Sequence, residues 1–290
     1  MRRNSDILAA DDFIRINDTA LMIKLTNSGA YDFPFRSSFE CRSVIGGTDA
    51  PVLLRIGPIR DFAEIERQLS EYNMSLLFSL EQHVRASELE AWYPLLKEYT
   101  PRSRVFDVLP DPDELMSEFA FPVFVKGSRQ TNRHSRKQCI IENADMYRSL
   151  QREWQSDPVL HWQRAAVREF IPLLTIDNTT FQDMVPFSYE FRFFYWMGEL
   201  AAYGAYWTLG RPYHLLDEDK REVLELTKKA ADIIGAPFLA IDAAKTQSGR
   251  WIIIEINDGQ ESGCCGVNPF ELWNAVFGKD RADDCGFARR

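Results

Sequence analysis

Oxygen-bearing side chains are concentrated at the end of one strongly hydrophobic stretch near the C-terminus. Residues 251–258 read WIIIEIND, so three consecutive isoleucines lead directly to Glu255, Asn257 and a further aspartate. A second apolar stretch, residues 238–244, carries Asp242. Mg²⁺ accepts carboxylate and amide oxygens as ligands, together with water and the phosphates of a substrate. These residue types therefore indicate a magnesium site built from Asp242, Glu255 and Asn257.

The two stretches are expected to pair as an antiparallel hairpin that brings two carboxylates together. If the turn consists of Ser248 and Gly249, Asp242 lies directly opposite Glu255. Facing Cβ atoms are then only about 5 Å apart, so the two like charges are destabilising unless a cation compensates them. On the two-residue alternation of a strand, Glu255 and Asn257 point to one side and the isoleucines at 252, 254 and 256 point to the other.

Two alternatives to the metal site stay open at this point. Asp242 and Glu255 could lie at an open rim, paired with Lys245 or Arg250, and a one-residue bulge would break the register. The role of Asp258 is also open, because it could add charge to the metal site or cap the loop that follows.

A basic segment offers the complementary charge. Residues 126–137, KGSRQTNRHSRK, hold five Lys or Arg, one His and no acid in a chain of net charge −9. Lys126 ends an apolar strand, a glycine and a serine follow where backbone N–H groups can approach an anion, and Lys137 is expected to open the next strand. Two such lysines can clamp a polyphosphate. The alternatives are a solvated loop or a contact with nucleic acid.

Two further strands carry charged pairs. Glu190 and Arg192 lie two residues apart and share one face of their strand. Such a pair is usually a surface ion pair that contributes little, but the aromatic residues around it can instead direct it into a cleft. Arg168 and Glu169, in VREFI, taken alone are best explained as charges at a strand edge. Neither GxxxxGK[ST] nor GxGxxG is present, so the sequence does not indicate a P-loop or a dinucleotide-binding fold.

The hydrophobic pattern predicts the elements that position these residues. Residues 1–50 are expected to be irregular, and residues 51–108 to form a small α/β unit with strands at 52–56 and 74–79, a helix capped by Asp61, and a helix opened by Ser87 and Glu90. Residues 109–118 are expected to be a linker. Residues 119–172 would form a lobe with strands at 121–126, 138–142 and 165–171 and a helix capped by Asn143. Residues 185–290 would hold a hairpin at 189–207, a helix at 217–234 and the hairpin with the metal ligands.

Composition limits the partners and the compartment. The net charge of −9 argues against nucleic acid and anionic membranes as partners. The sequence shows neither a membrane-spanning stretch nor a secretory signal, so a cytoplasmic protein is expected. Five cysteines without a CxxC pair fit reduced thiols, with a reactive thiol at the adjacent Cys264 and Cys265 as the alternative; the five are Cys41, Cys139, Cys264, Cys265 and Cys285.

Taken in order, these motifs resemble the ATP-grasp superfamily. The stretches that carry the resemblance are PVFVKGS, SRKQCII, VREFIPL, SYEFRFF and IDAAKTQSGRWIIIEINDGQESG. They are most similar to the divergent clade marked by one arginine and two lysines, which includes the eukaryotic chaperone that assembles a translation initiation factor. Lys126 and Lys137 match the lysines, and Arg192, in preference to Arg168, matches the arginine. The chain departs from the chaperones in having Glu255 and then NDG where they have Asp and then NP.

The resemblance implies an α/β (α+β) ATP-grasp fold, in which two α+β lobes hold the nucleotide between them and a small α/β pre-grasp domain precedes them in the chain. It implies ATP and Mg²⁺ as ligands, with Asp242, Glu255 and Asn257 on the metal. Cofactor-binding residues would be Lys126, Lys137, Arg168, Glu169, Phe170 and Glu190, with adenine on the backbone near Glu169 and Phe170 and with Arg192 and Lys137 catalytic.

The implied activity is that of a magnesium- and ATP-dependent carboxylate–amine ligase acting through an acylphosphate. Its partners would be a carboxylate- and amine-bearing small molecule, a peptide or a protein client. The alternative is an assembly protein that uses Mg-ATP as a ligand for a protein client without ligation. An RNA-interacting protein is a weaker reading, because the whole chain is acidic.

Overall fold

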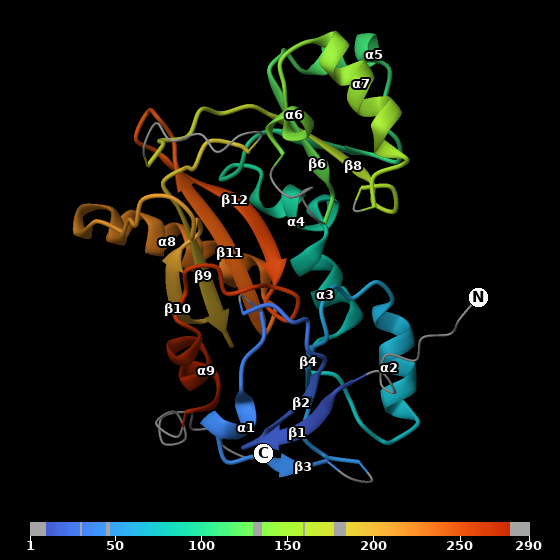
Figure 1. The fold of residues 1–290 in the computed structure, drawn as a ribbon, viewed down its shortest axis with the longest axis vertical. Helices are drawn as coiled ribbons and strands as arrows, with labels where there is room; N and C mark the ends of the chain where they lie inside the picture. The colour runs from blue at the N-terminus through green and yellow to red at the C-terminus, as the bar shows by residue number, and fades with distance from the viewer. Residues whose placement is uncertain are drawn as a thin grey trace.

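The residues that the structure describes form three four-stranded sheets, arranged along the long axis of the molecule (Figure 1). The computed structural model describes residues 10–29, 31–44, 47–129, 135–158, 160–176 and 184–278. The N-terminal sheet lies at one end, the sheet of the small lobe at the other, and the C-terminal sheet beside the middle of the molecule (Figure 1).

The N-terminal sheet has the order β3-β1-β2-β4, in which β2 and β4 run parallel. Its elements are β1 (Asp12–Ile16), β2 (Thr19–Ile23), α1 (Phe35–Ser38), β3 (Arg42–Ser43) and β4 (Val52–Arg55). The prediction that residues 1–50 are irregular is therefore wrong for the described residues. The first two strands are only five residues long and are joined by a tight turn with Asn17 at a φ of +50°. Strands this short leave a weak periodic signal.

The helices after β4 follow the prediction only in part. They are α2 (Phe62–Ser70), α3 (Leu80–Ser87) and α4 (Leu89–Leu96). The side chain of Asp61 caps α2 as expected. The predicted strand at 74–79 is wrong, because only Leu76 forms a bridge to β4, and Ser79 already caps α3 through a capping box with Gln82. The box predicted at Ser87 is also wrong, since that residue ends α3.

The small lobe contains a sheet of order β5-β8-β6-β7. Its elements are β5 (Ser103–Phe106), α5 (Pro112–Glu118), β6 (Val123–Gly127), α6 (Arg136–Cys139), β7 (Ile140–Ile141), α7 (Ala144–Trp154) and β8 (Ala165–Glu169). Asn143 caps α7 as predicted. The predicted linker 109–118 is wrong from residue 112 onward, where a proline at the first helical position starts α5. The predicted strand 138–142 shrinks to β7, because one helical turn precedes it.

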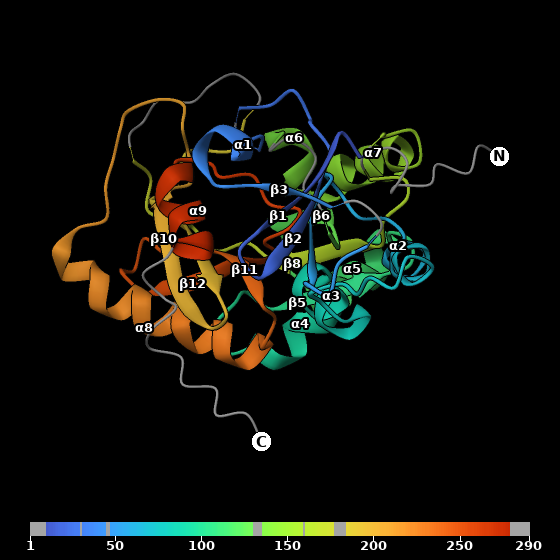
Figure 2. The ribbon, with the colours of Figure 1, turned by 90° about the horizontal axis from the view of Figure 1, so that it is seen from below.

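The C-terminal sheet has the order β10-β9-β11-β12 and is antiparallel throughout. Its elements are β9 (Glu190–Trp196), β10 (Glu199–Ala205), α8 (Asp217–Ile234), β11 (Phe238–Lys245), β12 (Trp251–Asp258) and α9 (Pro269–Phe277). Both hairpins and α8 confirm the prediction, and α8 ends at Gly235 in the left-handed conformation. The view from below shows α8 running along this sheet (Figure 2), where the hydroxyl of Tyr195 lies 2.8 Å from that of Thr227.

Buried apolar side chains divide the molecule differently from the sheets. One core cluster runs without a break from the N-terminal sheet to the C-terminal sheet, whereas the small lobe has a separate cluster around Tyr147 and Trp154. The predicted domain boundaries stay a prediction. None of the helices in the described ranges has the length and apolar character needed to cross a bilayer.

Candidate functional site

Three ionisable side chains lie in one row across the C-terminal sheet. Asp242 on β11 is the direct register partner of Arg192 on β9 and of Glu255 on β12. Opposed residues of neighbouring strands point to the same face of a sheet, so the three side chains lie together. Glu190, two residues from Arg192, shares that face. The structure thus confirms the predicted pairing of Asp242 with Glu255.

The pairing arises by a different route from the predicted one. Thr246 pairs with Arg250, so three residues form the turn where two were predicted. A bulge then restores the register, because Ala243 faces Ile253 while Asp242 faces Glu255, which leaves Ile254 as the extra residue. A bulge reverses the alternation of the strand. The predicted orientation of the isoleucines is accordingly wrong at 252 and 254, which line the same cavity as Glu255.

Arg192 and Asp242 form a buried two-point ion pair. The Nε and one terminal nitrogen of Arg192 donate to the two oxygens of Asp242 over 2.8 and 2.7 Å, and the other terminal nitrogen donates to the carbonyl of Gly263 over 2.8 Å. Burial opposes ionisation of both groups. The carboxylate nevertheless holds the pKa of Arg192 well above its ordinary value, while burial raises the pKa of Asp242 against the opposing effect of the arginine.

Lys126 enters the same site from the small lobe. It lies on β6, is 3% exposed, and forms an ion pair with Glu255. Burial would raise the pKa of Glu255, but Lys126 and then Arg192 outweigh it and bring that pKa below its ordinary value. Both predicted metal-binding carboxylates therefore have a cationic partner, and these partners differ from the Lys245 and Arg250 of the rim alternative.

A cavity of about 300 Å³ opens beside these ion pairs, between the sheet of the small lobe and the C-terminal sheet. Its walls are mostly apolar and include Phe124, Ile140, Phe170, Leu173, Trp207, Ile252 and Ile254. Lys126 and Glu255 lie at its charged part, together with Glu190. Burial raises the pKa of Glu190 to about 8, and the hydroxyl of Ser188 donates to it over 2.7 Å.

Most of the other predicted residues lie at this cavity. Glu169 and Phe170 line it at the end of β8. Arg168 also lines the cavity, but its guanidinium hydrogen-bonds to a protein group: it donates to the carbonyl of Ile254 over 2.6 Å. Burial lowers the pKa of Arg168 to about 10, although Glu255 opposes this.

Two predicted ligands lie further away. Lys137 lies on α6, so its expected position at the start of a strand is wrong; the residue is exposed and is not among those that line the cavity. Asn257 lies two residues beyond Glu255 on β12, and its side-chain nitrogen is 3.4 Å from a carboxylate oxygen of Asp242. Its amide therefore belongs to the carboxylate row without reaching the cavity wall.

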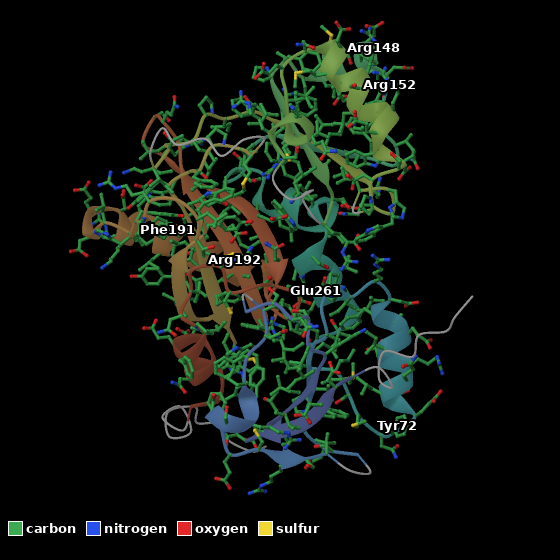
Figure 3. The ribbon with its side chains drawn as sticks, viewed as in Figure 1. Tyr72, Arg148, Arg152, Phe191, Arg192 and Glu261 are labelled. Carbon is green, nitrogen blue, oxygen red and sulfur yellow. The ribbon has the colours of Figure 1, made fainter. Side chains whose placement is uncertain are left out.

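Asp258 belongs to a neighbouring buried cluster and not to the row. Its carboxylate accepts from the backbone and side chain of Gln260 over 2.8 and 2.9 Å and lies 2.9 Å from Nδ1 of His83. The carboxylate of Glu261 in turn forms an ion pair with Arg129, whose terminal nitrogen lies 3.0 Å from a carboxylate oxygen. The capping alternative is thus confirmed. Figure 3 shows Arg192 and Glu261 in the middle of the molecule, where the C-terminal sheet approaches α3.

Several supporting residues were missed in the sequence. Arg55, 2% exposed at the end of β4, donates to the carbonyls of Gly259, Gln260 and Ser262 and so ties the loop after β12 to the N-terminal sheet. His83 was hidden in the unpredicted helix α3. An arginine that directly follows three apolar residues, Val52, Leu53 and Leu54, was the only sequence signal for Arg55.

The described cysteines are free thiols, as expected; Cys285 lies outside the described residues. Cys264 is buried and Cys265 is partly buried. Burial raises the pKa of Cys265 to about 11. A thiol that stays protonated at neutral pH is a poor nucleophile, so the reactive-thiol alternative gains no support.

Comparison with solved structures identifies the fold. The chain is similar to the RimK domain ATP-grasp protein from Sphaerobacter thermophilus, with a TM-score of 0.55 and 14% identity over 80% of this chain and 81% of that one. It is also similar to the D-alanine–D-alanine ligase from Bacillus anthracis complexed with ATP, with a TM-score of 0.53 and 15% identity over 79% and 75%. At this identity the likeness shows the fold, which is the ATP-grasp fold.

The family can be stated more closely. Residues 113–276 match the model described as ATP-grasp domain, R2K clade family 3. The match covers more than half of the 290 residues, and the chain belongs to this family. No curated protein matches the chain.

Proposed function

We propose that the protein is an ATP-grasp enzyme that uses Mg-ATP to join a carboxylate to an amine. The observation that carries this proposal is the row of Arg192, Asp242 and Glu255, which meets Lys126 at one end of a largely apolar cavity. Such a cavity suits a nucleotide whose base lies among apolar side chains and whose phosphates lie at the charged end.

The two carboxylates of the row, together with Asn257, fit a magnesium ion. Asp242, Glu255 and Asn257 offer carboxylate and amide oxygens, the donors that a hard cation prefers. They lie together on one face of two neighbouring strands. When held by these residues, Mg²⁺ would supply positive charge that neutralises the negative charge on the nucleotide phosphates.

The chain's own residues would bind the rest of the nucleotide. The base would lie between Phe124 and Ile252, with its polar edge on the backbone near Glu169 and Phe170. A protonated Glu190 can donate a hydrogen bond as well as accept one, which suits a hydroxyl or a ring nitrogen of the ligand.

The cations would serve the phosphates. Lys126 would exchange its partner Glu255 for a phosphate oxygen when the nucleotide enters. Three of the five N–H donors of Arg192 are used by Asp242 and Gly263, and we assign the other two to the transferring phosphoryl group. Lys137 keeps its proposed role through the resemblance alone, because α6 holds it outside the cavity lining.

The proposed reaction has two steps. A carboxylate oxygen of the substrate attacks the γ-phosphorus, and the bond between that phosphorus and the bridging oxygen breaks to release ADP and leave an acylphosphate. The nitrogen of an amine then attacks the acyl carbon. The carbon–oxygen bond to the phosphate breaks, inorganic phosphate leaves, and the amine loses a proton to give the amide.

Hydroxylamine tests the proposal, because it captures acylphosphates as hydroxamates. The purified protein is incubated with Mg-ATP, hydroxylamine and a library of amino acids and dipeptides, and ADP and hydroxamate are measured together. The expected result is equal release of ADP and hydroxamate with one class of carboxylate. Tight Mg-ATP binding without ADP release for any member would contradict the ligase and favour the assembly protein.

A further inference from the structure

Two cations on neighbouring strands of the small lobe reach consecutive residues of β12. Arg168 on β8 lies directly opposite Phe124 on β6, and Lys126 is two residues further along β6, so both cations share one face of that sheet. Lys126 pairs with the carboxylate of Glu255. Arg168 donates to the carbonyl of Ile254 over 2.6 Å.

Ile254 is the residue that does not fit the ladder between β11 and β12. It is the extra residue of the bulge, because its two neighbours face Asp242 and Ala243. A bulged residue is left unpaired by the partner strand, and a buried carbonyl without a donor costs about 1–3 kcal/mol. The guanidinium of Arg168, 4% exposed, supplies that donor from outside the sheet.

The rest of the guanidinium is fixed by two hydroxyl groups. Its Nε donates to Ser103 over 3.0 Å, and a terminal nitrogen donates to the hydroxyl of Thr100. Thr100 in turn donates to the carbonyl of Ile253 over 2.9 Å. The planar fork of an arginine can serve all these partners at once, and a lysine cannot.

The bulge determines the direction of Glu255. If the strand alternated regularly through Ile254, with no bulge there, the alternation that places Ile252 in the cavity would send Glu255 to the opposite face, which α8 covers. An interaction that stabilises the bulge therefore also keeps the carboxylate of Glu255 in the row with Asp242.

We propose that Arg168 is a positioning residue for the metal site, which acts on Glu255 through the bulge at Ile254 and not through contact with the nucleotide. This inference rests on the proposed function, since it takes Glu255 to be a magnesium ligand. Outer contacts of this kind commonly change metal affinity by about 10- to 100-fold when they are lost.

A matched pair at Thr100 gives the sharpest test, because this residue contacts the guanidinium but does not line the cavity. Thr100→Ser keeps the hydroxyl and Thr100→Val removes it. Arg168→Lys keeps the charge but not the fork. Arg148→Lys, on the outer face of α7 (Figure 3), is the control for a surface arginine.

Three quantities are measured for each variant. They are the Mg²⁺ concentration that gives half-maximal ATP binding in calorimetry, the affinity for ATP in EDTA, and hydrogen–deuterium exchange of β12 in the ligand-free protein. We expect the Mg²⁺ concentration for half-maximal binding to rise about 10- to 100-fold in Arg168→Lys and at least about 3-fold in Thr100→Val. In both variants, hydrogen–deuterium exchange at residues 253–257 should be faster, and the affinity for ATP in EDTA should change less than about 2-fold. Thr100→Ser and Arg148→Lys should match the wild type.

Two results would overturn the inference while leaving the proposed function in place. One is a wild-type Mg²⁺ requirement in both Arg168→Lys and Thr100→Val. The other is an equal loss of ATP affinity with and without Mg²⁺ in Arg168→Lys, which would mean that the arginine contacts the nucleotide directly. A wild-type protein that does not bind Mg-ATP would overturn the proposed function and this inference together.

Discussion

Removal of Arg192 should destabilise the protein by leaving a buried charge without its partner. In Arg192→Met, the carboxylate of Asp242 stays buried at 1% side-chain exposure and loses both charge-assisted hydrogen bonds. Breaking a buried ion pair by removing one partner typically costs about 3–5 kcal/mol, because an uncompensated charge is left inside. We therefore expect a loss of that size in the free energy of unfolding of the unit that contains the C-terminal sheet.

Burial, and not hydrogen-bond length, should set this magnitude. Lys228 and Asp232 on α8 form a pair at similar distances, 2.7 and 2.8 Å, but their side chains are 43% and 55% exposed. Exposed pairs of this spacing contribute about 0.3–0.5 kcal/mol. Lys228→Met is accordingly the matched control, with an expected loss below about 1 kcal/mol.

A double-mutant cycle provides the assay. Urea unfolding is followed by tryptophan fluorescence for the wild type, Arg192→Met, Asp242→Asn and the double variant. Neutralising Asp242 should restore at least about 2 kcal/mol to Arg192→Met, because the unpaired charge is removed. Losses that are equal for Arg192→Met and Lys228→Met, or a double variant no more stable than Arg192→Met, would refute the reasoning.

Three further predictions concern stability. Burial raises the pKa of Glu190 from 4.5 to about 8, so the stabilising contribution of this group is complete below pH 4.5 and is lost as the pH rises to 8. Over this window the free energy of unfolding of Glu190→Gln should rise, relative to that of the wild type, by up to about 1.4 kcal/mol per pH unit. A difference between the two proteins that stays constant with pH in urea titrations would contradict this. A Cβ at Gly204 would lie 2.4 Å from the carbonyl oxygen of Gly266, so Gly204→Ala should lose about 1–3 kcal/mol or more in calorimetric unfolding, whereas Gly29→Ala, with open space around it, should change little. Arg55→Met should remove the donor of three carbonyls of the loop after β12 and lose about 2–4 kcal/mol in urea unfolding, and a loss below about 1 kcal/mol would contradict this.

The strong periodic elements of the fold were predictable from the sequence. An 18-residue amphipathic helix with a glycine stop, as in α8, and two hairpins of aromatic and branched residues leave clear patterns. The short strands β1 and β2 do not, because five residues between charged positions fit a loop equally well. Ser79 with Gln82 and Ser87 with Glu90 are competing capping boxes, and tertiary packing selects the first.

At the candidate site, the two-residue alternation of a strand predicts the orientation of the side chains only where the strand has no bulge. The facing of Asp242 and Glu255 was found although the turn was counted one residue short, because the bulge at Ile254 adds the missing residue. The bulge itself has no signature in a run of three isoleucines. It depends on Arg168 and Thr100, which are distant in sequence and supply the hydrogen bonds that the ladder omits.

The central claim is that the row of carboxylates binds the magnesium of Mg-ATP, and calorimetry on Glu255→Gln tests it most directly. The matched control is Glu222→Gln, an exposed glutamate on α8. The wild type and the control should bind ATP more tightly with Mg²⁺ than in EDTA, and Glu255→Gln should bind Mg-ATP at least about tenfold more weakly than the wild type while it remains folded. Equal binding of Mg-ATP by all three proteins would contradict it.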